Sequence, residues 1–269
     1  MSAAENSAGP PIRLASTVLL LRDGAQGLEV FMVVRHQEID FASGALVFPG
    51  GKLAAGDHDP RLAARCSGAD GLTPEQLALR VAAVRETFEE CGVLLARGRG
   101  EAALLGPERL RQLGAHWRQP LDRGEAGMAE LLESEDLELA IEALVPFAHW
   151  ITPPFMPKRF DTWFFLAAAP PQQIAMHDGR EMVDSLWLRP ADALAQAAAG
   201  RHSLVPVTQM NVAKLGFSGS VAEALAAARA ATIVTVEPQC TPQAGGMLLR
   251  IPPEAGYRVD EFFMRIPGR

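Results

Sequence analysis

The sequence predicts a single domain of the mixed α/β or α+β class. Strand-like and helix-like segments are interspersed along its 269 residues without a regular strand–helix–strand alternation, and no long linker divides the chain. Hydrophobic residues make up 48% and charged residues 21%, as in globular proteins that bury a core without disulfides or metals. We expect residues 1–11 to form a disordered lead-in and residues 12–269 to form the domain.

The first expected elements are strands. Two β-rich runs within residues 16–36 flank Asp23-Gly24 and Gly27, which is a hairpin signal. The stretch "GALVFPGG", residues 44–51, predicts a short apolar strand that ends in a Pro-Gly-Gly turn. Residues 54–72 are rich in Gly, Asp and Ala, so we expect irregular structure there.

A helix is expected from residue 73 to residue 92. Thr73 as N-cap, Pro74 at the first helical position and Gln76 at the third form a capping box. Gly92 is well placed to end the helix, because glycine readily adopts the left-handed conformation that follows a helix.

The second half of the chain mixes both element types. Residues 97–142 are rich in Ala, Leu and Glu and predict helix, most clearly over "LLESEDLELAIEAL" at 131–144. Further strands and helices are expected in order: strands at 159–169 and 183–188, helices at 190–200 and 220–230, and a terminal pair of strands at 231–236 and 247–259.

Charge and cysteine content exclude several kinds of partner. The net charge is −7 and the basic residues form no run, so no nucleic-acid or anionic-membrane partner is expected. No stretch approaches 18 apolar residues, and the first residues lack the apolar core of a signal peptide. Three cysteines, Cys66, Cys91 and Cys240, lie far apart without a CxxC pair. We therefore expect a cytoplasmic protein without a thiolate metal site.

The helix at 73–92 carries an acidic face. At about 100° per residue, its apolar side chains fall on one stripe, which is expected to pack on a sheet: Leu77, Val81, Val84 and Phe88. Glu86, Glu89 and Glu90 project from the opposite side within an arc of about 100°. Ala82 and Ala83 continue the acidic side and are expected to leave room for an approaching group.

This acidic face is either a solvated helix surface or a binding site for an external cation. A solvated helix face normally places Lys or Arg four residues after each Glu, but Glu86 is followed by Glu90, a like-charge pair. Arg85 offers the one in-helix partner, to Glu89, and the acids lie at the helix C-terminus, where the dipole disfavours negative charge. This placement favours an external cation, and an all-oxygen cluster suits Mg²⁺ or Mn²⁺.

The acidic stretch and the glycine turn together resemble the Nudix box, GX5EX7REUXEEXGU. Gly51, five residues and then Asp57 precede "RETFEECGV", residues 85–93, in which the box positions recur at their required spacing. The chain departs from the pattern twice. Asp57 stands in place of Glu, and 27 residues (58–84) separate it from Arg85 where the box has 7, an insertion of 20. A surface loop tolerates such an insertion at modest entropic cost.

The chain is similar in particular to the Nudix branch of nucleoside diphosphate-linked moiety X motif 19, which tolerates this insertion. The similarity covers most of residues 14–230, including "HWITPP" at 149–154 and "EMVDSLWLRPADAL" at 181–194. Upstream, Arg35, Gly44 and "FPGG" at 48–51 resemble the pattern that accompanies the box in CoA-cleaving members.

This resemblance implies a fold and an activity. The expected fold is the Nudix fold, a mixed β-sheet sandwiched between helices, with insertions at 58–72 and about 97–142. The implied activity is Mg²⁺- or Mn²⁺-dependent hydrolysis of a small nucleotide diphosphate, CoA or acyl-CoA. The alternatives are an ADP-ribose or NADH-type pyrophosphatase and a non-catalytic Nudix-fold binding module. Oligomeric state is left open, with a homodimer as one option.

The resemblance also implies roles for individual residues. Arg85, Glu86, Glu89 and Glu90 are the expected catalytic residues. Glu86, Glu89, Glu90 and the Gly50 carbonyl are the expected metal ligands, and Asp57 is expected to pair with Arg85 behind them.

The general base is either a box glutamate or Glu181. Four further residues are expected to contact substrate: Arg35, Gly51, Lys52 and Arg159. Arg159 has an alternative as a structural partner of Asp161. His149 and Trp150 are interpreted as a hydrogen-bonded histidine and a core tryptophan, with substrate stacking as the alternative.

Overall fold

The computed structural model describes residues 10–35, 44–173 and 182–265. The centre of the molecule is an eight-stranded mixed β-sheet. Its strands follow the order β10-β2-β1-β9-β8-β11, with β3 paired to β2 and β4 paired to β1. β1 and β9 run parallel, as do β8 and β11, and the other pairs are antiparallel. The bounds are β1 Ile12–Gly24, β2 Gly27–Arg35, β3 Leu46–Val47, β4 Gly50–Lys52, β8 Val145–Ile151, β9 Arg159–Ala168, β10 Met182–Leu188 and β11 Thr235–Val236.

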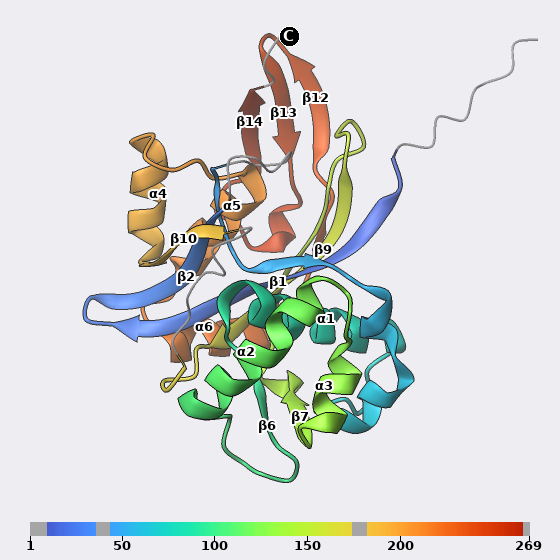
Figure 1. The fold of residues 1–269 in the computed structure, drawn as a ribbon. Helices are drawn as coiled ribbons and strands as arrows, with labels where there is room; N and C mark the ends of the chain where they lie inside the picture. The colour runs from blue at the N-terminus through green and yellow to red at the C-terminus, as the bar shows by residue number, and fades with distance from the viewer. Residues whose placement is uncertain (1–9, 36–43, 174–181, 266–269) are drawn as a thin grey trace, which may run out of the picture.

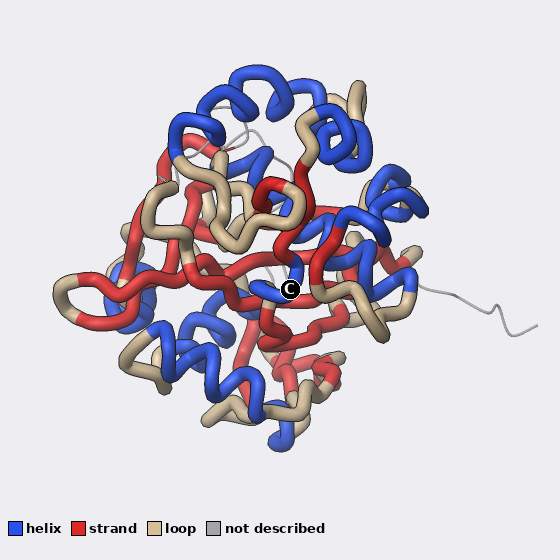
Figure 2. Tube along the Cα trace, turned by 90° about the horizontal axis from the view of Figure 1, so that it is seen from below, coloured by secondary structure: helices blue, strands red, loops and turns tan. Residues whose placement is uncertain are grey.

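Helices cover both faces of this sheet, as Figures 1 and 2 show, and this confirms the predicted sandwich. One apolar core contains residues of α1 (Pro74–Cys91), α2 (Pro107–Asp122) and α3 (Met128–Ser134). The other contains residues of α4 (Pro190–Ala198), α5 (Pro206–Leu215) and α6 (Val221–Ala230). The sheet lies between two hydrophobic layers, so both of its faces are buried.

The hairpin of β1 and β2 shows how the sequence produces this arrangement. The two strands pair from Leu21 with Val30 to Gly24 with Gly27, as the turn signal predicted. Val18 and Leu20 belong to the core that contains α1, α2 and α3, whereas Leu19 and Leu21 belong to the core that contains α4, α5 and α6. Alternate side chains point to opposite faces of a strand, so a run of leucines in β1 serves both cores.

The segment at 54–72 is more regular than expected. It forms two short 3₁₀ helices, Ala55–His58 and Pro60–Arg65, and the two-residue strand β5, Cys66–Ser67. Asp59 caps the second of these helices by accepting a hydrogen bond from the Arg61 N–H, and Leu62 anchors it in the core. Capping and one buried leucine therefore order a stretch whose composition predicted an irregular loop.

The segment at 97–142 is only partly helical. After β6 (Ala96–Gly98), α2 and α3 follow, but the helix expected over 131–144 ends at Ser134. Asp136 has φ 48°, and β7 (Leu137–Ala140) then pairs with β5 and β6 in a three-stranded sheet, followed by a 3₁₀ turn, Ile141–Ala143. Strand pairing overrides the local helix propensity here. The two insertions join in this small sheet, below the main sheet in Figure 1.

The C-terminal strands differ from the predicted terminal pair. β11 pairs with β8, whereas β12 (Gln239–Gln243), β13 (Gly246–Arg250) and β14 (Glu261–Arg265) form a separate three-stranded sheet, with a 3₁₀ turn at Pro253–Ala255. The sequence pattern also gave no signal for β8 or α5. No helix in the described part of the chain is long and apolar enough to cross a membrane.

Candidate active site

Helix α1 positions the acidic residues between two well-defined ends. At its start, the Gln76 N–H donates to the Thr73 hydroxyl (3.2 Å) and the Thr73 N–H donates to the Gln76 side chain (3.0 Å). At its end, Gly92 has φ 70° and its N–H donates to the Phe88 carbonyl at 2.9 Å. The predicted caps are both present, and they place the three glutamates on the last turns.

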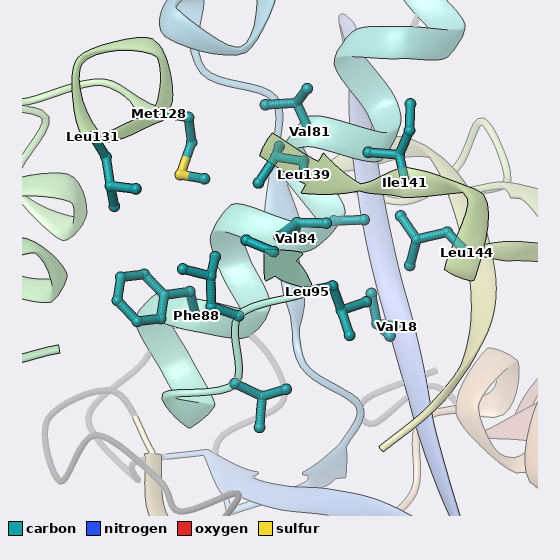
Figure 3. Close-up of a cluster of buried hydrophobic side chains, with 14 of the residues drawn as sticks. Val18, Val81, Val84, Phe88, Leu95, Met128, Leu131, Leu139, Ile141 and Leu144 are labelled. Atoms are coloured by element: carbon teal, nitrogen blue, oxygen red, sulfur yellow. The ribbon is translucent and has the colours of Figure 1, made fainter. Parts of the chain in front are cut away.

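The helix is buried on nearly all sides rather than on one stripe. Val81, Val84 and Phe88 pack in one cluster with Val18 of the sheet and with side chains from the insertion, among them Met128, Leu131, Leu139 and Ile141 (Figure 3). Ala82 and Ala83 are fully buried, so they do not leave the open space that the sequence suggested. The inserted segments supply a second apolar surface that encloses the helix.

Arg85 lies at the centre of the acidic cluster. Its guanidinium forms a bidentate pair with Asp57, with Nε donating at 2.8 Å and Nη2 at 2.9 Å. The Asp57 side chain is completely buried and also accepts from the Ala54 N–H at 2.8 Å. This pair ties the start of the first insertion to α1, and a bidentate arginine–carboxylate contact fixes geometry as well as charge.

The same guanidinium reaches two of the glutamates. Arg85 Nη1 donates to Glu86 at 3.0 Å and to Glu89 at 2.9 Å, and Nη2 also donates to the Lys52 carbonyl at 2.9 Å. Burial alone would lower the pKa of Arg85, but its hydrogen bond to Asp57 and the surrounding carboxylate charges raise the pKa above its ordinary value. Arg85 is therefore a permanent cation that orients the carboxylates around it.

The glycine turn contacts the glutamates directly. The Gly50 N–H donates to Glu90 Oε2 at 2.9 Å. Gly50 has φ 154°, and a Cβ at this position would lie 2.4 Å from the Ser16 carbonyl oxygen. A Cβ at Gly51 would lie 2.5 Å from Glu86 Oε1, so a side chain there would displace the carboxylate. Glycine at position 50 therefore lets the turn pack against β1, and glycine at position 51 lets it lie against Glu86 of α1.

Glu89 is an unusual buried acid. Its side chain is 8% exposed, and Oε1 is buried without a hydrogen-bond partner. Burial, with smaller contributions from the charges of Glu86 and Asp122, raises the pKa of Glu89 to about 8 against the opposing effect of Arg85. Desolvation outweighs a single ion pair here, so the carboxylate is available for a further positive group.

These residues fit a hard divalent cation. Arg85 pairs with three carboxylates, those of Asp57, Glu86 and Glu89, and the Glu90 carboxylate accepts from the Gly50 N–H. Arg118 donates to the backbone carbonyl of Glu89. In the described residues, no three Asp, Glu, His or Cys side chains are arranged to hold a metal ion on their own. Arg85 already occupies several of the carboxylate oxygens. An ion would therefore also need backbone, water or phosphate oxygens, which Mg²⁺ commonly uses.

Arg159 and Lys52 are placed differently from the carboxylate cluster. Arg159 donates to the Thr152 carbonyl (2.9 Å) and pairs with Glu237 (2.6 Å). Arg159 therefore pairs with Glu237 and not with Asp161, the structural partner that was the alternative in the sequence analysis. The Asp161 carboxylate contacts His149 instead. The Lys52 side chain is exposed at the end of β4.

Two other candidates lie partly or wholly outside the described residues. Arg35 closes β2, and its side chain is not among those described, while Glu181 lies outside the described residues.

His149 and Trp150 have structural partners within the fold. His149 hydrogen-bonds through Nδ1 to the Thr235 hydroxyl at 2.9 Å and through Nε2 to Asp161, and its ring stacks on Trp163 at 4.4 Å. Trp150 is buried and its indole N–H donates to the Tyr257 hydroxyl at 2.7 Å. These contacts match the interpretation of a hydrogen-bonded histidine beside a core tryptophan.

Sequence reasoning missed an apolar cavity of about 220 Å³ that adjoins the glycine turn. Its lining comes from seven separate parts of the chain, from Thr17 in β1 to Met264 in β14, and includes Gly50. Residues so distant in sequence share no local pattern. Along β14 the exposure of the side chains alternates, and this places Phe262 and Met264 on the cavity side.

Comparison with known proteins identifies relatives of this chain. Residues 58–215 match the model of the NUDT19 Nudix domain. Acyl-coenzyme A diphosphatase NUDT19 of Xenopus laevis is 24% identical over 204 residues, covering 62% of this chain and 54% of that protein. The human protein of the same name is 28% identical over 242 residues, covering 74% of this chain and 63% of that protein. The chain thus spans less than two thirds of the length of these relatives.

A solved structure supports the same fold. The crystal structure of a NUDIX hydrolase from Alicyclobacillus acidocaldarius superimposes with a TM-score of 0.67 at 28% identity, covering 80% of this chain and 96% of that one. The family model spans more than half of this chain and includes all of α1. The chain therefore belongs to the family of the NUDT19 Nudix domain.

Proposed function

We propose that this protein is a divalent-metal-dependent Nudix hydrolase that cleaves the diphosphate linkage of CoA or acyl-CoA. The relatives named acyl-coenzyme A diphosphatase support the substrate class. One structural observation carries the proposal: Glu86, Glu89 and Glu90 are held together by Arg85 and the Gly50 N–H, directly beside a turn that has no side chains. Such a site combines oxygen ligands with open backbone for a phosphate group.

Glu86, Glu89, Glu90 and the Gly50 carbonyl are the proposed ligands. A divalent ion bound by them supplies Lewis acidity and lowers the pKa of a bound water. Arg85 and Asp57 keep the carboxylates oriented, since both are buried and joined by two hydrogen bonds. The Gly50 N–H holds Glu90 against the turn, and the absence of a side chain at Gly51 lets the Glu86 carboxylate lie directly against it.

The proton from the attacking water needs an acceptor. We propose a box glutamate in this role and keep Glu181 as the second candidate. Glu181→Gln and Glu86→Gln, compared through the pH dependence of kcat, distinguish the two. The variant that removes the base loses the acidic limb of the profile, while the other keeps it. Arg35 and Lys52 remain proposed phosphate contacts, tested by a rise in KM on replacement with Met.

Hydrolysis of a substrate panel tests the proposed activity. CoA, hexanoyl-CoA, NADH and ADP-ribose are incubated with the protein and Mg²⁺ or Mn²⁺, and the products are separated. We expect the two CoA substrates to give adenosine 3′,5′-bisphosphate and a 4′-phosphopantetheine species with the highest kcat/KM. Preference for NADH or ADP-ribose would favour the dinucleotide pyrophosphatase alternative. A folded, metal-loaded protein that cleaves none of the four would be a binding module.

We also propose action in a reducing, cytoplasmic compartment. Cys66 and Cys91 are buried and Cys240 is partly buried, and none of the three forms a disulfide. A fluorescent fusion in fractionated cells tests this location. A homodimer and the absence of a nucleic-acid partner stay predictions, which light scattering and a DNA-binding titration at low salt would test.

A further inference from the structure

The apolar cavity beside the glycine turn has a defined set of walls. Three sides come from Val47, Phe48 and Gly50 before and within β4, from β8, β9 and the loop between them, and from the start of α5. The remaining wall is the C-terminal sheet, through Leu249 of β13 and Phe262 and Met264 of β14. In Figure 1 this sheet stands beside β9, at the end of the molecule opposite α2 and α3.

The cavity and the proposed hydrolytic site share one residue, Gly50. Gly50 lines the cavity, and the N–H of the same residue donates to Glu90 at 2.9 Å. Thr17, which pairs with Gly50 between β1 and β4, is also part of the lining. A diphosphate placed at the turn would therefore lie beside this cavity, which could receive one of its two substituents.

The chemistry of the walls selects between those substituents. None of the described lining residues carries a charge; besides apolar side chains they offer the hydroxyls of Thr17, Thr152, Thr162 and Thr208. The adenosine half of CoA carries a charged 3′-phosphate, whose burial here would be costly. The other half is a pantetheine arm with methyl groups, two amides and an uncharged thiol or thioester.

We propose that this cavity binds the acyl-pantetheine arm and that Met156, Phe262 and Met264 determine how well an acylated arm fits. The inference rests on the proposed function, because it places one half of that substrate. Apolar walls bury the methyl and alkyl groups, and the threonine hydroxyls are available to the amides. Trp150, another wall residue, is fixed by its hydrogen bond to Tyr257, so this part of the cavity is rigid.

Neighbouring residues provide matched controls. On β14, Met264 lines the cavity, whereas the adjacent Phe263 is 45% exposed and does not. In the loop before β9, Met156 lines the cavity and Phe155 is 38% exposed outside it. Met264→Trp and Met156→Trp fill the cavity from two different walls, and Phe263→Trp and Phe155→Trp add similar bulk to the surface.

Two measurements test the proposal. Calorimetry measures binding of S-hexanoyl-pantetheine, which has no phosphate, and of adenosine 3′,5′-bisphosphate. Steady-state kinetics measures kcat/KM for CoA and hexanoyl-CoA. We expect either cavity variant to weaken S-hexanoyl-pantetheine binding and to lower kcat/KM for hexanoyl-CoA about tenfold or more. Adenosine bisphosphate binding and both surface variants should stay within about twofold of the unmodified protein.

The outcomes separate this proposal from the proposed function. If S-hexanoyl-pantetheine binds equally to all variants, or if the cavity variants weaken the adenosine bisphosphate instead, the assignment of the arm is wrong. If neither CoA substrate is hydrolysed, the proposed function fails, yet the calorimetry still shows whether the arm occupies the cavity. If one cavity variant does not fold, the other, on an independent wall, gives the same test.

Discussion

The carboxylate cluster and the apolar cavity share Gly50 but are built in different ways. The cluster uses residues from two short stretches, 50–57 and 85–90, and is held by hydrogen bonds and ion pairs. The cavity uses residues spread from Thr17 to Met264 and is formed by apolar packing. Directional polar contacts fix the positions of a few groups, whereas apolar walls set a shape. In the proposed enzyme, the first region would supply chemistry and the second selectivity.

The largest effect is expected from a substitution that removes one charge from the cluster. Glu90→Gln keeps the shape of the side chain and can still accept from the Gly50 N–H, but it loses the negative charge proposed to hold a metal. We expect kcat for hexanoyl-CoA to fall on the order of 10³-fold. S-hexanoyl-pantetheine binding in the cavity should be unchanged. Glu75→Gln, in the exposed first turn of α1, is the control and should retain activity.

If Glu90→Gln instead weakened binding in the cavity as strongly as it reduced turnover, the two regions would not be separable.

The difference between local polar contacts and dispersed apolar walls also explains which features could be predicted from the sequence. The spacing of Arg85, Glu86, Glu89 and Glu90 and the caps at Thr73 and Gly92 are local, so the pattern of one helix predicted them. The pairing of Asp57 with Arg85 was expected only through the resemblance to the Nudix box, because the two residues are 28 positions apart.

Non-local contacts account for what the sequence did not show. The helix expected over 131–144 gave way to β7, because Leu137–Ala140 pairs with two strands that lie far away in the chain. Ala83 is buried in the apolar cluster that α1 shares with side chains of the same segment. The cavity is the extreme example, because each of its walls comes from a different stretch of the sequence. Local patterns predict elements, but not what covers them.

The next largest effect concerns the stability of the cluster. Arg85→Met leaves the buried carboxylate of Asp57 and the partly desolvated Glu89 without their cation. Removing one partner of a buried ion pair is expected to lower the free energy of unfolding by about 3 kcal/mol. Urea denaturation measures this change. Arg111→Met, which breaks an exposed pair with Glu108, should change the free energy of unfolding far less.

Equal losses for Arg85→Met and Arg111→Met would mean that the Arg85 network adds no more than a surface ion pair.

The acidity of Glu89 gives a pH dependence of stability. Its folded-state pKa of about 8 lies above the ordinary value of 4.5, so the folded protein binds a proton more tightly than the unfolded chain. The contribution of Glu89 to the free energy of unfolding of the metal-free protein is therefore greatest at low pH. It decreases as pH rises from about 4.5 to about 8. The slope from one such group is at most about 1.4 kcal/mol per pH unit.

Glu89→Gln should flatten this part of the profile, because the amide does not titrate. Thermal unfolding of both proteins in EDTA between pH 5 and pH 8 measures the difference, with Mg²⁺ added in a parallel series. If the two proteins lose stability equally with rising pH, ionisation of Glu89 in the folded state costs nothing.

The smallest expected effect lies at the C-terminal end of the cluster. Gly92 has φ 70°, and an added Cβ would lie 3.2 Å from Arg118 Nη1. Gly92→Ala should lower the free energy of unfolding by about 1 kcal/mol, since the left-handed conformation is strained for alanine. Gly127→Ala is the control: its φ is −114° and its Cβ would meet nothing within 4 Å.

The activity of Gly92→Ala shows how rigidly the last turn must be held. Arg118 donates to the Glu89 carbonyl, so a displaced Arg118 would loosen the turn that carries Glu89 and Glu90. A fall in kcat larger than the loss of stability explains would show that hydrolysis depends on this positioning, whereas cavity binding should not change. Unchanged kcat would instead mean that Arg85 and the Gly50 N–H alone are sufficient to hold the carboxylates.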